Sequence, residues 1–296
     1  MMNIKKISVL TSLYRCESFL FCYFEALSAI EGKEQIEVLL LHNAPQEKEL
    51  DIIAGHLPSF DFVRHIIIPE REGLYTTWNR GIRLAQGEYV TIWNVDDVRF
   101  PNSVLQQAEI LDKNPQAAIA YGDIWISSSY GVCGSTKTNT PMYNEKKFFF
   151  KSYGMSCFQM WRKSIHDTIG YYDEQFKCVA DFDFQIKAAI HFCFVKTANP
   201  LGIYLEEQPH KISANGLQEL ENNIVYLRYG VFEKINFFTL KHSLKKYRKD
   251  YLLQNNQWQL FSEQQPFGKI HKIFGMVAGL VHSIIQQLKK KLCSHF

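Results

Sequence analysis

Apolar runs of strand length alternate with helical stretches in the first part of the chain, and this alternation constrains the fold most strongly. The predicted strands are residues 7–13, 37–41, 62–68, 88–93 and 117–127. Helical patterns occupy residues 17–30, 46–56, 76–86 and 101–113 between them. Strands that alternate with helices predict an α/β fold, with a mostly parallel sheet covered by helices on both faces.

The alternation ends near residue 128. Residues 128–141 are rich in Ser, Thr and Gly, and with the basic aromatic segment 144–154 they predict a flexible flap. Further helices are predicted at residues 162–169 and 181–190. After residue 217 the pattern is helical only, so the sequence predicts a C-terminal helical extension without strands.

The composition is that of a globular protein. Of the 296 residues, 46% are hydrophobic and 21% charged, which suffices for a sizeable core. Seven cysteines without a C-x-x-C pair argue against a zinc site and favour a reducing, cytoplasmic location. The first apolar run is short and interrupted by Ser8 and Thr11, which indicates a strand rather than a signal peptide. No apolar stretch approaches the roughly 20 residues of a membrane-spanning helix.

Positive charge is concentrated in the tail. Residues 241–296 contain ten Lys or Arg and two acidic residues, a net charge of +8, whereas residues 1–240 carry −5. A polyanionic surface is therefore the expected neighbour of the tail. No nucleic-acid-binding motif occurs in the sequence, so we expect no nucleic-acid partner.

Polar residues follow almost every predicted strand of the sheet. Ligands of open parallel sheets bind at the carboxyl ends of the strands, so these residues are candidates for one shared site. The candidates are Thr11, Ser12 and Tyr14 after the first strand, His42 and Asn43 after the second, Gly73 after the third, and Asn94, Asp96 and Asp97 after the fourth.

Asp96 and Asp97 form a carboxylate pair at the end of the fourth strand. Adjacent carboxylates repel each other unless a cation lies near them, and a hard divalent metal that holds a diphosphate is the natural occupant. The alternative is an ordinary solvated turn before the helix at residues 101–113, where acidic residues are favourable near the helix N-terminus.

The segment REGLYTTWNRGIRLAQGEYVTIWNVDDVRFP resembles a motif of the family-two inverting glycosyltransferases, which have the GT-A fold. The matching residues are Gly73, Asn79, Gly81, Ala85, Gly87, Glu88, Tyr89, Asp96 and Asp97. ISVLTSLYR and EVLLLHNAP resemble the first two strands of that family, and residues 158–189 resemble its acceptor-side pattern. The resemblance covers roughly residues 5–215 and leaves out the tail.

The resemblance implies a GT-A domain over residues 1–216, with a nucleotide-sugar half to about residue 125 and an acceptor half after it, followed by the helical region 217–296. It also implies inverting transfer of a sugar from a nucleotide-diphosphate donor to a hydroxyl of a glycan or lipid-linked acceptor, in surface polysaccharide or glycolipid synthesis. Mn or Mg is the implied cofactor. The resemblance implies that Asp97 binds the metal and that Asp96 contacts the ribose or sugar hydroxyls of the donor. It also implies that Asp181 is the base that accepts the proton of the acceptor hydroxyl.

Three residues depart from the family pattern. Asn94 stands in place of the first aspartate of the metal motif, His42 in place of an aspartate that recognises the base, and Ala180 in place of a glutamate before Asp181. Asp183 therefore stays an alternative to Asp181. The departures also keep open a catalytically silent sugar-nucleotide or glycan-binding module. A nucleotidyltransferase is the weaker alternative, because no glycine-rich loop follows the first strand.

Two further features lie toward the C-terminus. His210 stands where many GT-A enzymes place a histidine near the metal, although a lone histidine is more often a surface or structural residue. Apolar residues at spacings of three and four between residues 270 and 292 predict an amphipathic helix that ends in three lysines. Packing on protein and binding to an anionic membrane surface are both consistent with this pattern.

Overall fold

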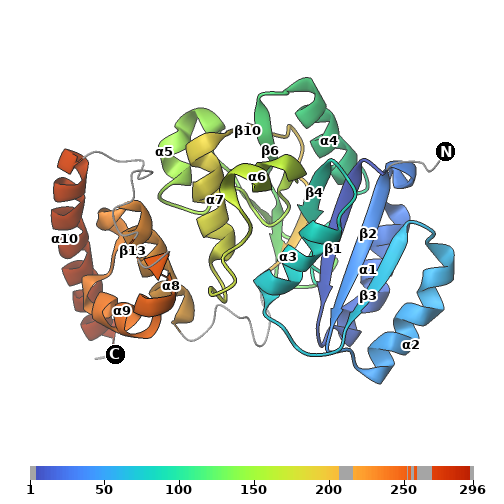
Figure 1. Ribbon diagram of the computed structural model, residues 1–296, viewed down its shortest axis with the longest axis horizontal. Coiled ribbons are helices and arrows are strands. Elements are labelled where there is room, and N and C mark those ends of the chain that lie inside the picture. The colour runs from blue at the N-terminus through green and yellow to red at the C-terminus, as the bar shows by residue number, and fades with distance from the viewer. Residues whose placement is uncertain (1–4, 207–215, 252, 255–256, 259–268, 294–296) are drawn as a thin grey trace. The chain divides into compact units, whose positions relative to one another are not determined.

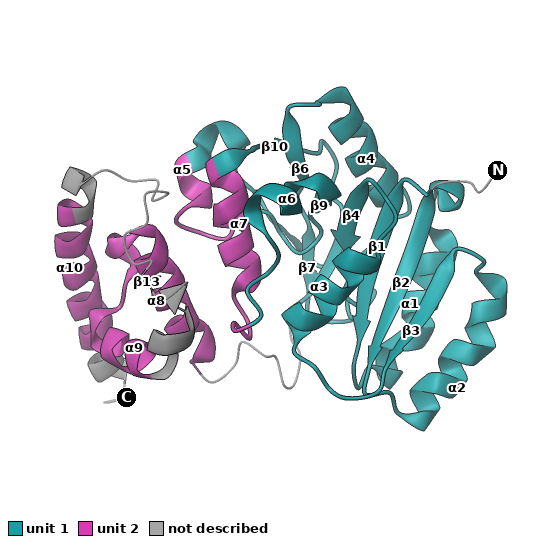
Figure 2. Cartoon of the chain, viewed as in Figure 1, with its two compact units in different colours: residues 1–146, 154–174, 191–209 teal, residues 147–153, 175–190, 210–296 magenta. Residues whose placement is uncertain are grey.

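The computed structural model describes residues 5–206, 216–251, 253–254, 257–258 and 269–293 (Figure 1). The chain divides into two compact units (Figure 2). The first unit contains residues 1–146, 154–174 and 191–209, and the second contains residues 147–153, 175–190 and 210–296. The chain therefore passes between the units several times.

A seven-stranded sheet forms the centre of the first unit, in the order β10-β6-β9-β4-β1-β2-β3. Only β9 runs antiparallel to its neighbours, β4 and β6; the other neighbouring pairs are parallel. The strands are β1 (Ile7–Leu13), β2 (Ile36–Asn43), β3 (Val63–Ile68), β4 (Tyr89–Ile92), β6 (Ala117–Tyr121), β9 (Met160–Arg162) and β10 (Cys193–Lys196). The mostly parallel sheet that the sequence predicts is confirmed.

Helices cover both faces of this sheet. Val9 on β1 belongs to the core cluster that includes residues of α1 and α4, while Leu10 points to the other face, toward α3. A Cβ at Gly81 of α3 would lie 2.6 Å from Leu41 Cδ1 and 3.1 Å from Leu10 Cδ1, so the missing side chain allows the close approach of helix and sheet. The helices are α1 (Glu17–Ala29), α2 (Glu47–His56), α3 (Leu74–Leu84) and α4 (Ser103–Lys113).

Residues 117–127, predicted as one strand, form two strands in different sheets. β6 joins the large sheet, whereas β7 (Trp125–Ser127) joins a smaller sheet of order β5-β11-β7-β8. The chain turns between them at Gly122, where a Cβ would overlap Thr197 Oγ1. The other strands of the small sheet are β5 (Val98–Arg99), β8 (Thr136–Lys137) and β11 (Gly202–Leu205).

The helix predicted at residues 162–169 is confirmed over residues 163–169, and only Arg162 belongs to a strand. The chain forms β9, then the short 3-10 helix η4 (Lys163–Ile165) and α6 (His166–Ile169). Met160 and Trp161 of β9 are completely buried between β4 and β6.

The second unit is mainly helical, as predicted. Its helices are α7 (Ala180–His191), α8 (Leu217–Tyr229), η5 (Phe232–Lys234), α9 (Phe237–Tyr251) and α10 (Lys269–Cys293). The first residue of α5 (Lys146–Phe149) belongs to the first unit and the others to the second. The expectation of helices only after residue 217 is wrong, because β12 (Leu253–Gln254) and β13 (Gln257–Trp258) form a short antiparallel hairpin. Within the described part of the chain, each helix is too short or too polar to cross a membrane.

Candidate active site

The carboxyl edge of the large sheet carries backbone strain at two strand ends. Arg15 follows β1 with φ 49°, and Ala44 follows β2 with φ 45°, although neither is glycine. A residue with a Cβ costs about 1–3 kcal/mol in such a conformation, and strain of this kind clusters at functional sites. This edge is therefore the first candidate for a binding site.

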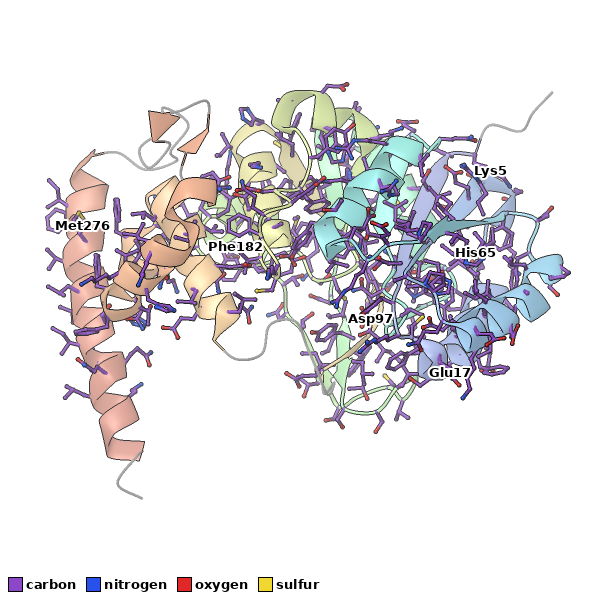
Figure 3. The ribbon with its side chains drawn as sticks, turned by 60° about the horizontal axis from the view of Figure 1, so that its bottom comes forward. Lys5, Glu17, His65, Asp97, Phe182 and Met276 are labelled. Atoms are coloured by element: carbon purple, nitrogen blue, oxygen red, sulfur yellow. The ribbon has the colours of Figure 1, made fainter. Side chains whose placement is uncertain are left out.

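Asp97 lies at this edge, just after β4, with only 1% of its surface exposed (Figure 3). Its carboxylate accepts hydrogen bonds from the Leu205 backbone N–H at 3.2 Å and from Asn94 Nδ2 at 3.1 Å. Burial, and after it the charge of Asp96, raise the pKa of Asp97 to about 8. A buried carboxylate that resists ionisation in this way is suited to a cation that neutralises it.

Asn94 and Trp93 hold the turn that carries this carboxylate. Trp93 is fully buried and donates from Nε1 to the Asp97 carbonyl oxygen at 2.9 Å. Because the Asn94 amide nitrogen faces Asp97, its carbonyl oxygen is the atom left to contact a ligand. Asp96 is only half-buried, so the pair combines one fixed and one more accessible carboxylate.

Arg99 is a buried cation beside the carboxylate pair that the sequence analysis missed. It is 2% exposed and donates to Gln107 Oε1, Ile92 O and Thr91 Oγ1. Burial lowers the pKa of Arg99 to about 9, and the charge of Asp97 acts in the opposite direction. Its position two residues after Asp97, in the segment Arg99-Phe100-Pro101, is the signal that the sequence offers.

His42 lies at the end of β2 in a closed network. Its Nδ1 is 3.0 Å from His65 Nε2, its Nε2 is 3.2 Å from Glu49 Oε2, and the ring is fully buried. Glu49 also accepts the backbone N–H groups of Cys16 and Gln46. Both nitrogens of His42 are thus engaged within the protein, and the ring ties β2 to β3 and α2.

The side chains of Ser12 and Tyr14, at the end of β1, are only partly buried. The Arg71 guanidinium lies 4.3 Å and the Arg15 guanidinium 5.4 Å from the centre of the Tyr14 ring. Ser12 Oγ accepts a bond from Trp78 Nε1 at 3.4 Å. The edge therefore holds an aromatic ring with two exposed cations, an arrangement that suits a base and a phosphate.

The remaining predicted donor residues lie deeper, except Gly73, which is exposed. Thr11 is fully buried and bonded to Tyr23 OH, and Asn43 bonds Glu72 and Thr77. Gly73 caps the N-terminus of α3. Asn79, 1% exposed, is bonded to Tyr172 and Glu174. The buried side chains of Thr11, Asn43 and Asn79 thus help to position the carboxyl edge of the sheet through hydrogen bonds inside the protein.

Asp181 and Asp183 both belong to the second unit but have different surroundings. Asp181 is half-buried at the start of α7, where its Oδ1 accepts the Phe182 N–H at 2.9 Å. Asp183 is fully buried and contacts Arg228 Nη1 at 2.7 Å, Lys187 Nζ at 2.8 Å and Tyr229 OH at 2.9 Å. Burial alone would raise the pKa of Asp183, but Lys187 and Arg228 lower it to about 2.

A metal site is not complete in the described part of the chain, where no cluster of three or more His, Cys, Asp or Glu side chains could hold an ion. His210, predicted as a metal ligand, lies outside the described residues. The oxygen donors present are the Asp96 and Asp97 carboxylates and the Asn94 carbonyl. They are hard donors of the type that Mg²⁺ and Mn²⁺ prefer.

Solved structures show the same fold. The crystal structure of residues 1–349 of S. aureus TarS in complex with UDP-GlcNAc matches with a TM-score of 0.64, over 93% of this chain and 71% of that chain, at 14% identity. The corresponding complex with UDP matches with a TM-score of 0.61, over 83% and 73% of the two chains, at 14% identity. The chain thus has a fold of the GT-A type, with a pair of carboxylates after β4.

The sequence places the chain in a family. The family model described as Glycosyl transferase family 2 matches residues 8–171, and the chain belongs to this family. A Mycobacterium tuberculosis relative, "PGL/p-HBAD biosynthesis glycosyltransferase Rv2957", is 25% identical over 192 residues, which are 64% of this chain and 69% of its own. A Methanocaldococcus jannaschii glycosyltransferase is 23% identical over 184 residues, 61% and 63% of the two chains.

Proposed function

We propose that this glycosyltransferase moves a sugar from a nucleotide-diphosphate donor to an acceptor hydroxyl with inversion at the anomeric carbon, in the synthesis of a surface polysaccharide or glycolipid. The buried Asp97 beside Asp96, at the carboxyl end of β4, is the observation that carries the proposal. The TarS complex with UDP-GlcNAc supports a nucleotide-sugar donor. The mycobacterial relative is named as a biosynthesis glycosyltransferase, which supports a role in the synthesis of a glycosylated product.

Asp96 and Asp97 would hold a divalent ion, with the Asn94 carbonyl oxygen as a neutral third donor. The bound ion would offset the charge that develops on the leaving diphosphate. The chain has a physical reason to bind it, because burial and mutual repulsion otherwise keep Asp97 protonated near neutral pH. Asn94 in place of a carboxylate lowers the negative charge of the site, so we expect weak affinity for the ion.

We expect the donor to contact the partly buried and exposed side chains at the carboxyl edge of the sheet. Tyr14 offers a ring face, Ser12 a hydroxyl and Arg71 a cation, whereas His42 is bonded through both nitrogens. We therefore infer that His42 serves the donor indirectly, by fixing the end of β2. Arg15 and Arg71 supply positive charge toward a phosphate.

Asp181 is the proposed base for the acceptor hydroxyl. It is half-buried, and its position at the first turn of α7 favours the ionised form that accepts a proton. Asp183 is unsuited to this role, because Arg228 and Lys187 hold its charge in a buried ion-pair network. The ion pairs of Asp183 support Asp181 as the base, of the two carboxylates that the sequence leaves open.

The test is a panel of nucleotide-diphosphate sugars, assayed for binding and for turnover with and without Mn²⁺ or Mg²⁺. Asp97→Asn should weaken metal-dependent nucleotide binding far more than metal-free binding. Asp181→Asn should keep donor binding and lower turnover by roughly 100-fold or more, the usual effect of losing a general base.

Asp167→Asn, which alters an exposed carboxylate on α6, is the matched control and should turn over normally. Donor binding without turnover in the wild-type chain across the panel would contradict the enzymatic proposal and favour the silent binding module. Equal loss of metal-dependent and metal-free binding in Asp97→Asn would contradict the metal site.

A further inference from the structure

The helix α10 packs on its own unit through small residues rather than through its apolar stripe. Gly275, Gly279 and Ser283, each four residues from the next, are the buried positions of the helix that face η5 and α9. A Cβ at Gly279 would overlap the Phe232 carbonyl oxygen, which shows how closely the two backbones approach. Ser283 Oγ accepts the Phe237 N–H at 2.9 Å and donates within its helix or to Ile235 O.

The opposite side of α10 is apolar and exposed. Leu280, for example, exposes 50% of its surface, and Figure 3 shows Met276 projecting away from the helix. Exposed fractions of 44–71% hold for Ile273, Phe274, Met276, Val277, Leu280, Val281, Ile284, Ile285 and Leu288. At 100° per residue these side chains cover about half of the helix circumference, centred opposite Gly279. A helix that only packed on protein would bury this stripe.

The surroundings of the stripe are positively charged. The sequence of α10 contains Lys269, Lys272 and Lys289–Lys291 and no acidic residue. The neighbouring α9 adds Lys241 and Lys245, both exposed. Each lysine near an anionic membrane contributes attraction of about 1 kcal/mol. A second copy of the same surface would bring the lysines of two chains together, which disfavours self-association.

The length of the stripe favours a helix that lies in the membrane surface. Residues 273–288 span about 24 Å at 1.5 Å per residue, less than the roughly 30 Å of a bilayer's hydrocarbon core. The face with Gly275, Gly279 and Ser283 is bonded to the rest of the unit and is not available to lipid. A one-sided apolar helix with flanking lysines is the arrangement of interfacial membrane helices.

We propose that the exposed apolar face of α10 docks the protein on an anionic phospholipid surface, with the helix parallel to the membrane plane. This goes beyond the proposed sugar transfer and does not depend on it. The face would bury its apolar side chains among the acyl chains, while the lysines meet the phosphates of the headgroups. The folded unit already displays the face, so no rearrangement is required.

The test is co-sedimentation of the full-length protein with vesicles of phosphatidylcholine alone or with about 30% phosphatidylglycerol, at low and high salt. We expect binding to the anionic vesicles that weakens as salt rises. The double variant V277Q/V281Q removes apolar burial without a change of charge and should weaken binding at least tenfold. Because both residues are exposed, the variant should fold normally, with an unchanged melting temperature.

The matched control is F21Q, which alters a phenylalanine of α1 that is 63% exposed but lies in the other unit. It should bind vesicles like the wild type. K289Q/K290Q/K291Q should weaken binding by about fivefold per lysine at low salt, and much less at high salt. Loss of binding only in the α10 variants supports the proposal.

Three results would overturn it: no sedimentation with anionic vesicles at low salt, sedimentation that V277Q/V281Q leaves unchanged, or equal binding to neutral vesicles. If sedimentation velocity instead shows a dimer that V277Q/V281Q dissociates, while vesicles are not bound, the face belongs to a second copy of the chain. Sugar-transfer activity on a soluble acceptor should be the same in all these variants, which separates this test from that of the proposed function.

Discussion

Asp181 and Asp183 stand two residues apart on α7, yet they differ in burial. Asp183 is enclosed by Arg228, Lys187 and Tyr229, whereas Asp181 is half-buried and accepts the backbone N–H of Phe182. Sequence spacing cannot make this distinction, because Arg228 lies 45 residues further along the chain. The buried ion pairs of Asp183 are thus formed by contacts that the sequence spacing does not reveal.

Asp183→Asn should destabilise the protein by about 3–5 kcal/mol, because it leaves the Arg228 guanidinium buried without its partner charge. Asp181→Asn should change the free energy of unfolding by less than about 1 kcal/mol. Chemical denaturation at pH 7 measures both. Equal denaturation midpoints for the two variants would show that the Asp183 network does not stabilise the fold. Because Asp183→Asn should destabilise the fold, this variant is unsuitable as a control with normal turnover for Asp181→Asn.

His65 gives the fold a specific acid sensitivity. Burial, and after it the charge of His42, lower the pKa of His65 to about 4 from an unfolded value near 6.5. The unfolded chain therefore binds more protons between these pH values, so the stabilising contribution is complete above pH 6.5 and is lost as pH falls toward 4. His65→Gln should flatten the fall in melting temperature over this range relative to wild type.

The expected difference for His65→Gln is about 2–4 °C at pH 4.5, which corresponds to roughly 1 kcal/mol for a chain of this size, because partial exposure of the ring reduces the effect. Thermal unfolding from pH 4 to pH 8 measures it. Parallel curves for the two proteins would mean that His65 titrates normally in the fold.

At the scale of the element, α10 depends on two glycines in unequal ways. A Cβ at Gly279 would overlap the backbone oxygen of Phe232, which cannot move without shifting η5. A Cβ at Gly275 would lie 3.1 Å from Glu233 Oε2, the end of a side chain that can rotate. The same substitution at the two positions therefore separates close backbone packing from helix propensity.

Gly279→Ala should destabilise the protein by about 1–3 kcal/mol through overpacking, despite the gain in helix propensity. Gly275→Ala should be neutral or stabilising by up to about 1 kcal/mol. Melting temperatures of the two variants give the comparison. If Gly279→Ala is the more stable of the two, the small-residue face of α10 does not pack against η5 as described.

At the scale of the whole molecule, α7 is tied to the helices that follow residue 217. Glu221 of α8 is fully buried and accepts the backbone N–H groups of Lys177 and Cys178, just before α7. Arg228 of α8 pairs with Asp183 within α7. The proposed base Asp181 therefore rests on a segment whose support comes from the C-terminal region.

A chain that ends at residue 216 should lose this support and unfold at a melting temperature lower by about 10 °C or more, because Asp183 and the N–H groups before α7 lose their partners. A chain that ends at residue 251 keeps α8 and α9 and is the control, with a smaller loss expected. Differential scanning calorimetry measures both. Equal melting temperatures for the two shortened chains would show that residues 1–216 fold independently, as the sequence-based domain boundary predicts.

The amino-acid pattern predicts the alternating strands and helices, the mostly parallel sheet and the carboxylate pair after β4. These features depend on local periodicity and on residues close together in the chain, which is why pattern and spacing suffice to predict them. Asp96 and Asp97 lie at the carboxyl edge because the strand before them ends there, whatever the rest of the chain does.

The strand neighbours and ion-pair partners of these elements can be read only from the three-dimensional structure. The insertion of β9 between β4 and β6, the division of residues 117–127 between two sheets and the pairing of Asp183 with Arg228 all join residues distant in sequence. The face of α10 that packs is another such case, because the apolar stripe predicts burial but the two glycines permit a closer approach. Non-local contacts of this kind depend on the shape and charge of a partner that no local pattern encodes.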